Sequence, residues 1–117
     1  MIYGNPSFPI LSKDIMDSLF EEIGDETFYE ALDAFMAEIG EFSAQALHGL
    51  SLEDLRVQAH SLKSSARMFG TIALAESAFE LEKASKSQNQ ALVNELLAQI
   101  LVECQSTLET LKETCSV

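Results

Sequence analysis

One histidine of the sequence stands among cationic and hydroxyl side chains at the spacing of a helical face. His60 is followed by Lys63, Ser64 and Arg67 at offsets of three, four and seven residues. In an α-helix these offsets place side chains on neighbouring turns of one face. A neutral imidazole can act as a nucleophile near pH 7, while an ammonium group and a hydroxyl can stabilise an anion. The spacing therefore indicates a site where His60 meets an anionic group.

The charge around this histidine is opposite in sign to that of the chain as a whole. The 117 residues carry 19 acids against 7 lysines and arginines, which gives a net charge of −12. Residues 55–75 contain Arg56, Lys63 and Arg67 but no aspartate or glutamate. The overall charge argues against nucleic acid and anionic membranes as partners. The local charge favours an anion near His60.

Helices are the expected setting of this site. Hydrophobic residues make up 47% of the sequence, and both prolines lie within its first nine residues. Strand-like alternation bracketed by hairpin turn signals does not occur. Long helices are therefore permitted along nearly the whole chain. The expected helices span residues 12–23, 26–48, 51–70, 72–86 and 90–114.

An apolar stripe on the third expected helix determines the direction of His60. Its members follow one another at steps of three and four residues, the repeat of a buried helical face. Since His60 directly follows Ala59, a member of the stripe, its side chain is expected to point away from the core. The stripe consists of Leu52, Leu55, Ala59, Leu62, Ala66 and Phe69.

The start of the chain is expected to be an arm followed by a short helix. Residues 1–11 form the arm, in which Phe8 and Ile10 are predicted to pack against the body. Ser12 is a suitable N-cap for the short helix, and Asp25 for the helix that follows. The side of the short helix that faces the core is expected to contain Ile15, Leu19 and Ile23.

Four long helices with short connections predict an all-α fold. The expected arrangement is an antiparallel up-down four-helix bundle with a short extra N-terminal helix. Residues 12–117 are expected to form a single domain, because a chain of this length builds one core. A monomer is expected, because four helices can bury their own apolar stripes.

The two cysteines and the absence of targeting signals favour the cytoplasm. Cys104 and Cys115 are eleven residues apart on one expected helix, so helical rise separates them by about 16 Å, too far for a disulfide. Both are expected to be core thiols. No apolar run is long enough to span a membrane, and the N-terminus lacks the regions of a signal peptide.

Neither histidine has the spacing of a metal site in a helical bundle. A di-iron bundle needs Glu-x-x-His on two helices. The residue three positions before His60 is Val57, and the residue three positions before His48 is Gln45. His48 is expected at a helix C-terminus. An acidic cluster near the start of the chain is expected to be solvated rather than to bind metal, and it contains Glu21, Glu22, Asp25, Glu26 and Glu30.

The pattern from His60 to Glu82 resembles the signature of histidine phosphotransfer (Hpt) domains of two-component phosphorelays. That signature has His-x-Leu-Lys, a small residue, serine, a second small residue, a hydrophobic residue before glycine, and a following helix with a Leu-Glu pair. The matching residues are His60, Leu62, Lys63, Ser64, Ser65, Ala66, Phe69, Gly70, Leu74, Leu81 and Glu82.

This resemblance implies a phosphorelay intermediate. His60 would accept a phosphoryl group from the aspartate of one receiver domain, such as that of a hybrid sensor kinase, and pass it to a response regulator. Lys63 would be the cation beside the phosphoryl group, with Ser64 and Arg67 also stabilising it, and Gly70 would end the helix. The chain would have no autokinase activity and no cofactor of its own, since Mg²⁺ is expected in the partner receiver domain.

One residue departs from the family pattern. Most members have glycine where Ser64 stands, which gives a partner close approach. Serine is the next smallest choice. The departure is therefore expected to affect which partner is preferred more than whether the site is active.

Two other functions use a helical bundle. The dimerisation domain of a sensor kinase has a His-Glu pair followed by proline, whereas Ser61 follows His60 here and no proline comes after it. A helical module that docks signalling proteins without being phosphorylated is the remaining alternative to the relay.

Overall fold

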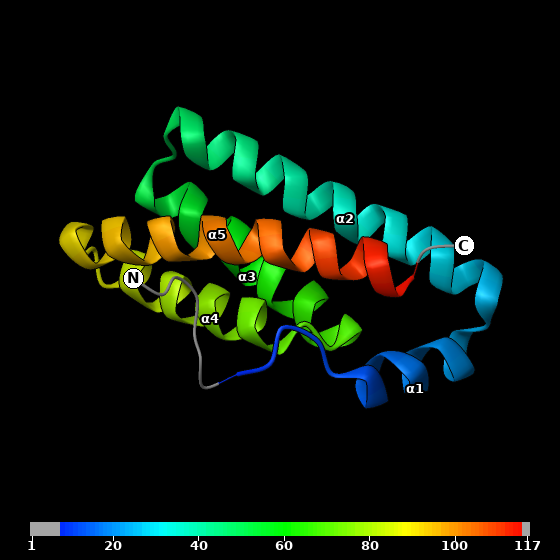
Figure 1. The fold of residues 1–117 in the computed structure, drawn as a ribbon. Helices are drawn as coiled ribbons and strands as arrows, with labels where there is room; N and C mark the ends of the chain where they lie inside the picture. Colours follow the sequence, from blue (N-terminus) through cyan, green and yellow to red (C-terminus); the bar gives the residue numbers. More distant parts are fainter. Residues whose placement is uncertain (1–7, 116–117) are drawn as a thin grey trace.

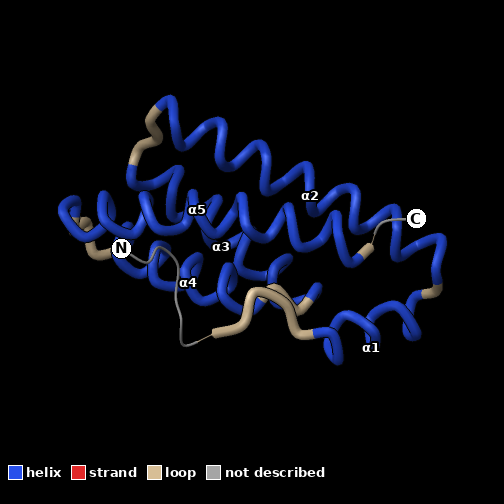
Figure 2. The backbone as a smooth tube through the Cα atoms, in the orientation of Figure 1, coloured by secondary structure: helices blue, strands red, loops and turns tan. Residues whose placement is uncertain are grey.

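The structure of the chain is a computed structural model that describes residues 8–115, and within them the fold is all helical. Figure 2 shows helices and loops without a strand over this part of the chain. The expected helix bounds are confirmed to within two residues. The helices are α1 (Lys13–Ile23), α2 (Asp25–His48), α3 (Leu52–Phe69), α4 (Ile72–Lys86) and α5 (Gln90–Thr114) (Figure 1).

Four long helices surround one core. Helix α3 packs against α4, α4 packs against α5, and α2 contacts both α3 and α5, while α1 contacts α2 and α3. In Figure 1, α2 and α4 run from right to left, and α3 and α5 run from left to right. The reversal between α3 and α4 brings residues far apart in sequence onto facing turns.

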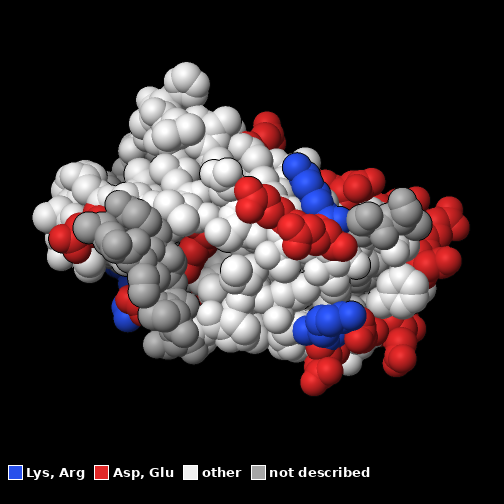
Figure 3. Space-filling view, viewed as in Figure 1, with Lys and Arg blue, Asp and Glu red and all other residues white. Residues whose placement is uncertain are grey.

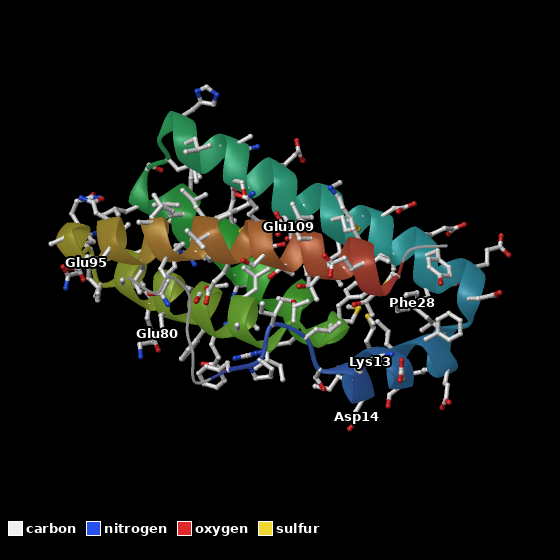
Figure 4. All side chains as sticks on the ribbon, viewed as in Figure 1. Lys13, Asp14, Phe28, Glu80, Glu95 and Glu109 are labelled. Carbon is white, nitrogen blue, oxygen red and sulfur yellow. The ribbon has the colours of Figure 1, made fainter. Side chains whose placement is uncertain are left out.

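The core consists of the apolar stripes read from the sequence. All predicted members on α3 are buried except Leu52, which is half-buried against the core. Phe69, at the end of α3, stacks on Phe35 of α2 with ring centroids 4.8 Å apart and meets Phe28 edge-on at 5.8 Å. Phe28 in turn points toward α1 (Figure 4) and lies 5.2 Å from the ring of Phe20.

The predicted helix ends are largely confirmed, with one correction at the start of α2. Ser12 and Ser51 cap α1 and α3, accepting hydrogen bonds from Ile15 N and Asp54 N at 3.3 and 3.1 Å. Asp25, however, is the first residue of α2 rather than its cap. Gly24, with φ 83°, ends α1 and begins α2 at once. The connection is thus a single residue, which leaves no room for Asp25 to act as the cap.

The N-terminal segment is held by its backbone more than by its side chains. Phe8 and Ile10 are exposed, so their predicted packing against the body is wrong. Instead, Ala73 N donates to Pro9 O at 2.9 Å and Ser12 N donates to Gly70 O at 2.7 Å. Residues 1–7 of the expected arm lie outside the described residues.

Helix α1 buries a different residue from the one expected. Met16 is buried, whereas Ile15 is 41% exposed. Leu19 and Ile23 are half-buried against the core, as predicted. The difference arises because α1 packs on the ends of α2 and α3, so its contact face is narrow. None of the helices in the described part of the chain is long and apolar enough to cross a bilayer.

Candidate functional site

His60 lies on the outer face of α3, in the middle of the helix. Its side chain is 60% exposed, although its neighbour Ala59 and the next stripe residue, Leu62, are completely buried. The buried stripe therefore holds α3 in a fixed rotation about its axis, and His60 points outward as the sequence predicts.

A carboxylate from the neighbouring helix α4 bridges His60 and Lys63. Glu82 Oε2 lies 2.8 Å from His60 Nδ1, and Glu82 Oε1 lies 2.7 Å from Lys63 Nζ. The side chains of Glu82 and Lys63 are only 17% and 13% exposed, so this ion pair lies at the base of the site while the imidazole stands above it. The three residues form a chain from ammonium to carboxylate to imidazole.

The bridge determines which imidazole nitrogen is available for chemistry. The hydrogen bond from Lys63 is the largest influence on Glu82 and holds the pKa of its carboxyl below the ordinary value of 4.5, outweighing partial burial, which acts to raise it. A carboxylate accepts hydrogen bonds and cannot donate them. The proton in the His60 contact therefore resides on Nδ1, and in the neutral ring the lone pair of Nε2 is then free.

The hydroxyl of Ser64 is turned toward its own helix. Its Oγ donates to the carbonyl oxygen of His60 at 3.3 Å, and the residue is exposed one turn beyond the imidazole. Such a bond to the carbonyl four residues back is common for serine within a helix. Ser64 therefore presents a small, internally bonded side chain to an approaching partner.

The two arginines of the positive segment lie away from the imidazole. Arg67 is exposed two turns beyond His60, and its guanidinium carbon lies 6.0 Å from the centre of the Phe79 ring. Arg56 is hydrogen bonded to Glu53 within its own helix, through Nε at 3.0 Å and Nη2 at 2.5 Å. Among Arg56, Lys63 and Arg67, Lys63 is the cation linked to His60, because Glu82 contacts both side chains.

The remaining residues of the sequence pattern shape the end of α3. Gly70 adopts a left-handed conformation with φ 78°, and a Cβ added there would lie 2.8 Å from Ser12 O. Thr71 follows as the N-cap position of α4, and its Oγ1 donates to Ala66 O at 3.0 Å. Within the pattern, Leu62, Ala66 and Phe69 are buried, and Ser65 is half-buried.

Glu82 is the functional residue that sequence reasoning missed. In the sequence pattern it appears only as half of a Leu-Glu pair, with no role assigned to it. The turn between α3 and α4 supplies the missing signal. Since these helices run in opposite directions, residues equidistant from Thr71 lie at the same level of the hairpin, and His60 and Glu82 are each eleven residues from it.

The other polar and thiol groups lie outside this site. His48 is the last residue of α2 and is exposed. Across residues 8–115 no three histidine, cysteine, aspartate or glutamate side chains come together as a metal site. Cys104 is buried, and this burial raises the pKa of its thiol to about 11, whereas Cys115 is half-buried.

Comparison with known proteins gives concordant results. The profile of the Hpt domain family matches residues 26–114, from α2 to the end of α5. The phosphorelay protein LuxU of Vibrio cholerae is 29% identical over 107 residues, which cover 89% of this chain and 88% of LuxU. The crystal structure of histidine-containing phosphotransfer protein B (HptB) from Pseudomonas aeruginosa PAO1 superposes with a TM-score of 0.80 at 25% identity, covering 91% of this chain and 94% of HptB.

Proposed function

This chain belongs to the Hpt domain family and serves as a phosphorelay intermediate, and we propose that the phosphoryl group is carried on His60. The observation that supports this assignment most directly is the contact of Nδ1 with Glu82. In the neutral ring it leaves the lone pair of Nε2 free, on an exposed side chain that is carried by two packed helices. A nucleophile for phosphoryl transfer needs these properties.

In the proposed reaction, the lone pair of Nε2 attacks the phosphorus of an aspartyl phosphate on a receiver domain. A P–N bond forms as the P–O bond to the aspartate breaks, and the carboxylate leaves with the electron pair. The ring gains positive charge during the attack, which the carboxylate of Glu82 stabilises across Nδ1. In the second transfer, the aspartate of the next receiver domain attacks phosphorus and the P–N bond breaks.

Lys63 has two functions in this proposal. Its ammonium group keeps Glu82 ionised, as the direction of the Glu82 pKa indicates, and it places positive charge beneath the incoming phosphoryl group. In this proposal Arg67, two turns away, adds to the positive electrostatic potential at His60 without contacting the phosphoryl group. Ser64 is small enough to let the partner approach the imidazole.

We also propose the partners, the location of the metal ion, the assembly state and the domain arrangement. The receiver domains belong to a hybrid sensor kinase and to a response regulator, and any Mg²⁺ belongs to the receiver. The chain has no autokinase activity, needs no cofactor, and acts as a cytoplasmic monomer. Helices α2 to α5 form an antiparallel four-helix bundle within a domain of residues 12–117, with α1 as the extra helix and residues 1–11 as an arm.

Transfer of label from a phosphorylated receiver domain tests the relay against the alternative of a phosphorylation-independent docking module. The expected result is acid-labile label on the wild-type chain, no label on His60→Gln, and normal labelling of His48→Gln, which removes the other histidine. Absence of label from the wild type, or equal labelling of His60→Gln, would favour the docking module.

A further inference from the structure

We propose that a cationic patch along the groove between α3 and α4 docks the acidic rim of the partner protein and sets its orientation on His60. The patch consists of Lys63, Arg67, Phe79 and Lys83. This inference rests on the proposed function, because the partner is the protein that delivers or removes the phosphoryl group. It assigns a function to Phe79 and Lys83, neither of which belongs to the phosphoryl site.

The patch is organised around one aromatic ring. The Phe79 ring lies half-buried on α4, with Lys83 Nζ 5.1 Å, Lys63 Nζ 5.5 Å and Arg67 Cζ 6.0 Å from its centre. Cations within about 6 Å of an aromatic face are attracted by the ring. Phe79 therefore gathers three positive groups, of which Lys63 is also paired with Glu82 at 2.7 Å and Lys83 with Glu80 at 3.6 Å.

This concentration of positive charge contrasts with the rest of the molecule. Three of the seven lysines and arginines meet at one ring in a chain with 19 acids. Acidic side chains gather at the end where α1 meets α2 (Figure 3). An acidic partner approaching such a surface is repelled nearly everywhere, so the patch selects where it lands.

The two sides of His60 differ in their balance of charge, which gives the partner a direction. On the α4 side, the three cations of the patch outnumber the two carboxylates paired with them, Glu80 and Glu82. On the α2 side, Ser61 Oγ donates to Glu38 Oε2 at 2.8 Å, and Glu38 and Glu41 both line the groove between α2 and α3. A partner whose acidic rim faces α4 gains attraction, and the reversed orientation places its acids against Glu38 and Glu41.

A single partner can cover both the patch and the histidine. Arg67 is seven residues beyond His60 on the same helix, a rise of about 10 Å. A specific protein interface covers about 800 Å² of each partner. The exposed groups of the patch, Arg67 and the 61% exposed Lys83, are therefore within reach of a protein that has its aspartate at His60.

Charges of this kind act mainly on encounter between the two proteins. Exposed complementary charges accelerate association and are screened by salt. The test is the rate of transfer from a phosphorylated receiver domain at increasing receiver and NaCl concentrations. Lys83→Glu is expected to raise the half-saturating receiver concentration about tenfold at low salt while the maximal rate stays the same, and Lys83→Gln is expected to give a smaller rise.

Lys112→Glu is the matched control, because it makes the same change of net charge at an exposed position in the last turn of α5. Equal effects of Lys83→Glu and Lys112→Glu would overturn the patch and leave the relay intact. A fall in maximal rate with an unchanged half-saturating concentration would also overturn docking. A wild-type chain that accepts no phosphoryl group would overturn the relay together with this inference.

Discussion

His60 and Glu82, on neighbouring antiparallel helices, meet at 2.8 Å because each lies eleven residues from Thr71. The same symmetry brings Lys63 and Phe79 together, since each lies eight residues from that turn. The site is thus built from facing turns of one helical hairpin, which the buried stripe of α3 anchors to the core. An imidazole held in this way points outward and, when neutral, carries its proton on Nδ1.

The first prediction concerns the rate of phosphotransfer in Glu82→Gln. The amide keeps a similar shape but loses the negative charge that selects the Nδ1 proton and stabilises charge on the ring. We expect transfer to His60 to slow about ten- to a hundredfold, the equivalent of one charge-assisted hydrogen bond. The measurement is single-turnover transfer from a phosphorylated receiver domain.

The control for this variant is Glu95→Gln, which changes an exposed glutamate on α5 (Figure 4). It should transfer at the wild-type rate. Equal slowing of both variants would mean that net charge, rather than contact with Nδ1, governs the reaction. An unchanged rate in Glu82→Gln would mean that the imidazole needs no carboxylate.

The second prediction follows from the lowered pKa of Glu82, for which the hydrogen bond from Lys63 is the main cause. On acidification the unfolded chain takes up this proton near the ordinary value of 4.5, while the native chain resists until its lower pKa is reached. The unfolded state then binds more protons, so stability falls as pH falls.

Urea denaturation of the wild type and Glu82→Gln over a pH series measures this effect. Above about pH 5 the wild type should be more stable by about 1–2 kcal/mol. That difference should shrink as pH drops through the native pKa of Glu82. A difference that stays constant at every pH would refute the assignment of this stability to the ionised carboxylate.

The sequence predicted the elements well and the arrangement of the site less well. Helix bounds follow from local signals, such as Ser51 at a cap and Gly70 at an end, and apolar periodicity identifies the buried face of α3. The meeting of His60 with Glu82 depends on the register between two helices: the turn at Thr71 puts both residues at one level, but the rotation of α4 that points Glu82 at the imidazole is a tertiary property. The exposure of Ile15 likewise depends on how α1 lies across its neighbours, which is a tertiary property.

The third prediction compares two glycines that both have positive φ. Gly49, with φ 90°, has no atom within 4 Å of an added Cβ, whereas at Gly70 that Cβ would lie 2.8 Å from Ser12 O and 3.0 Å from Ile15 Cβ. Gly49→Ala should cost about 1–3 kcal/mol in free energy of unfolding, from backbone conformation alone, because its ψ of 127° lies outside the αL region. Gly70→Ala should cost more than this even though Gly70 is in the milder αL conformation, because α1 must also shift. If Gly70→Ala loses no more stability than Gly49→Ala in denaturant titrations, α1 moves away from the added Cβ at little cost in free energy.

The fourth prediction concerns the two thiols of α5. Burial raises the pKa of Cys104 to about 11, so on the order of a thousandth of it is thiolate at pH 8. Cys115 is half-buried at the end of the helix, where its Sγ lies 3.7 Å from Met16 Sδ.

Iodoacetamide should therefore alkylate Cys115 first in the native protein, with Cys104 reacting only as the chain unfolds. Peptide mass spectrometry over a time course separates the two sites, and labelling in guanidinium chloride, where both should react alike, provides the control. Equal native rates would show that the core around Cys104 opens far more readily than its packing indicates.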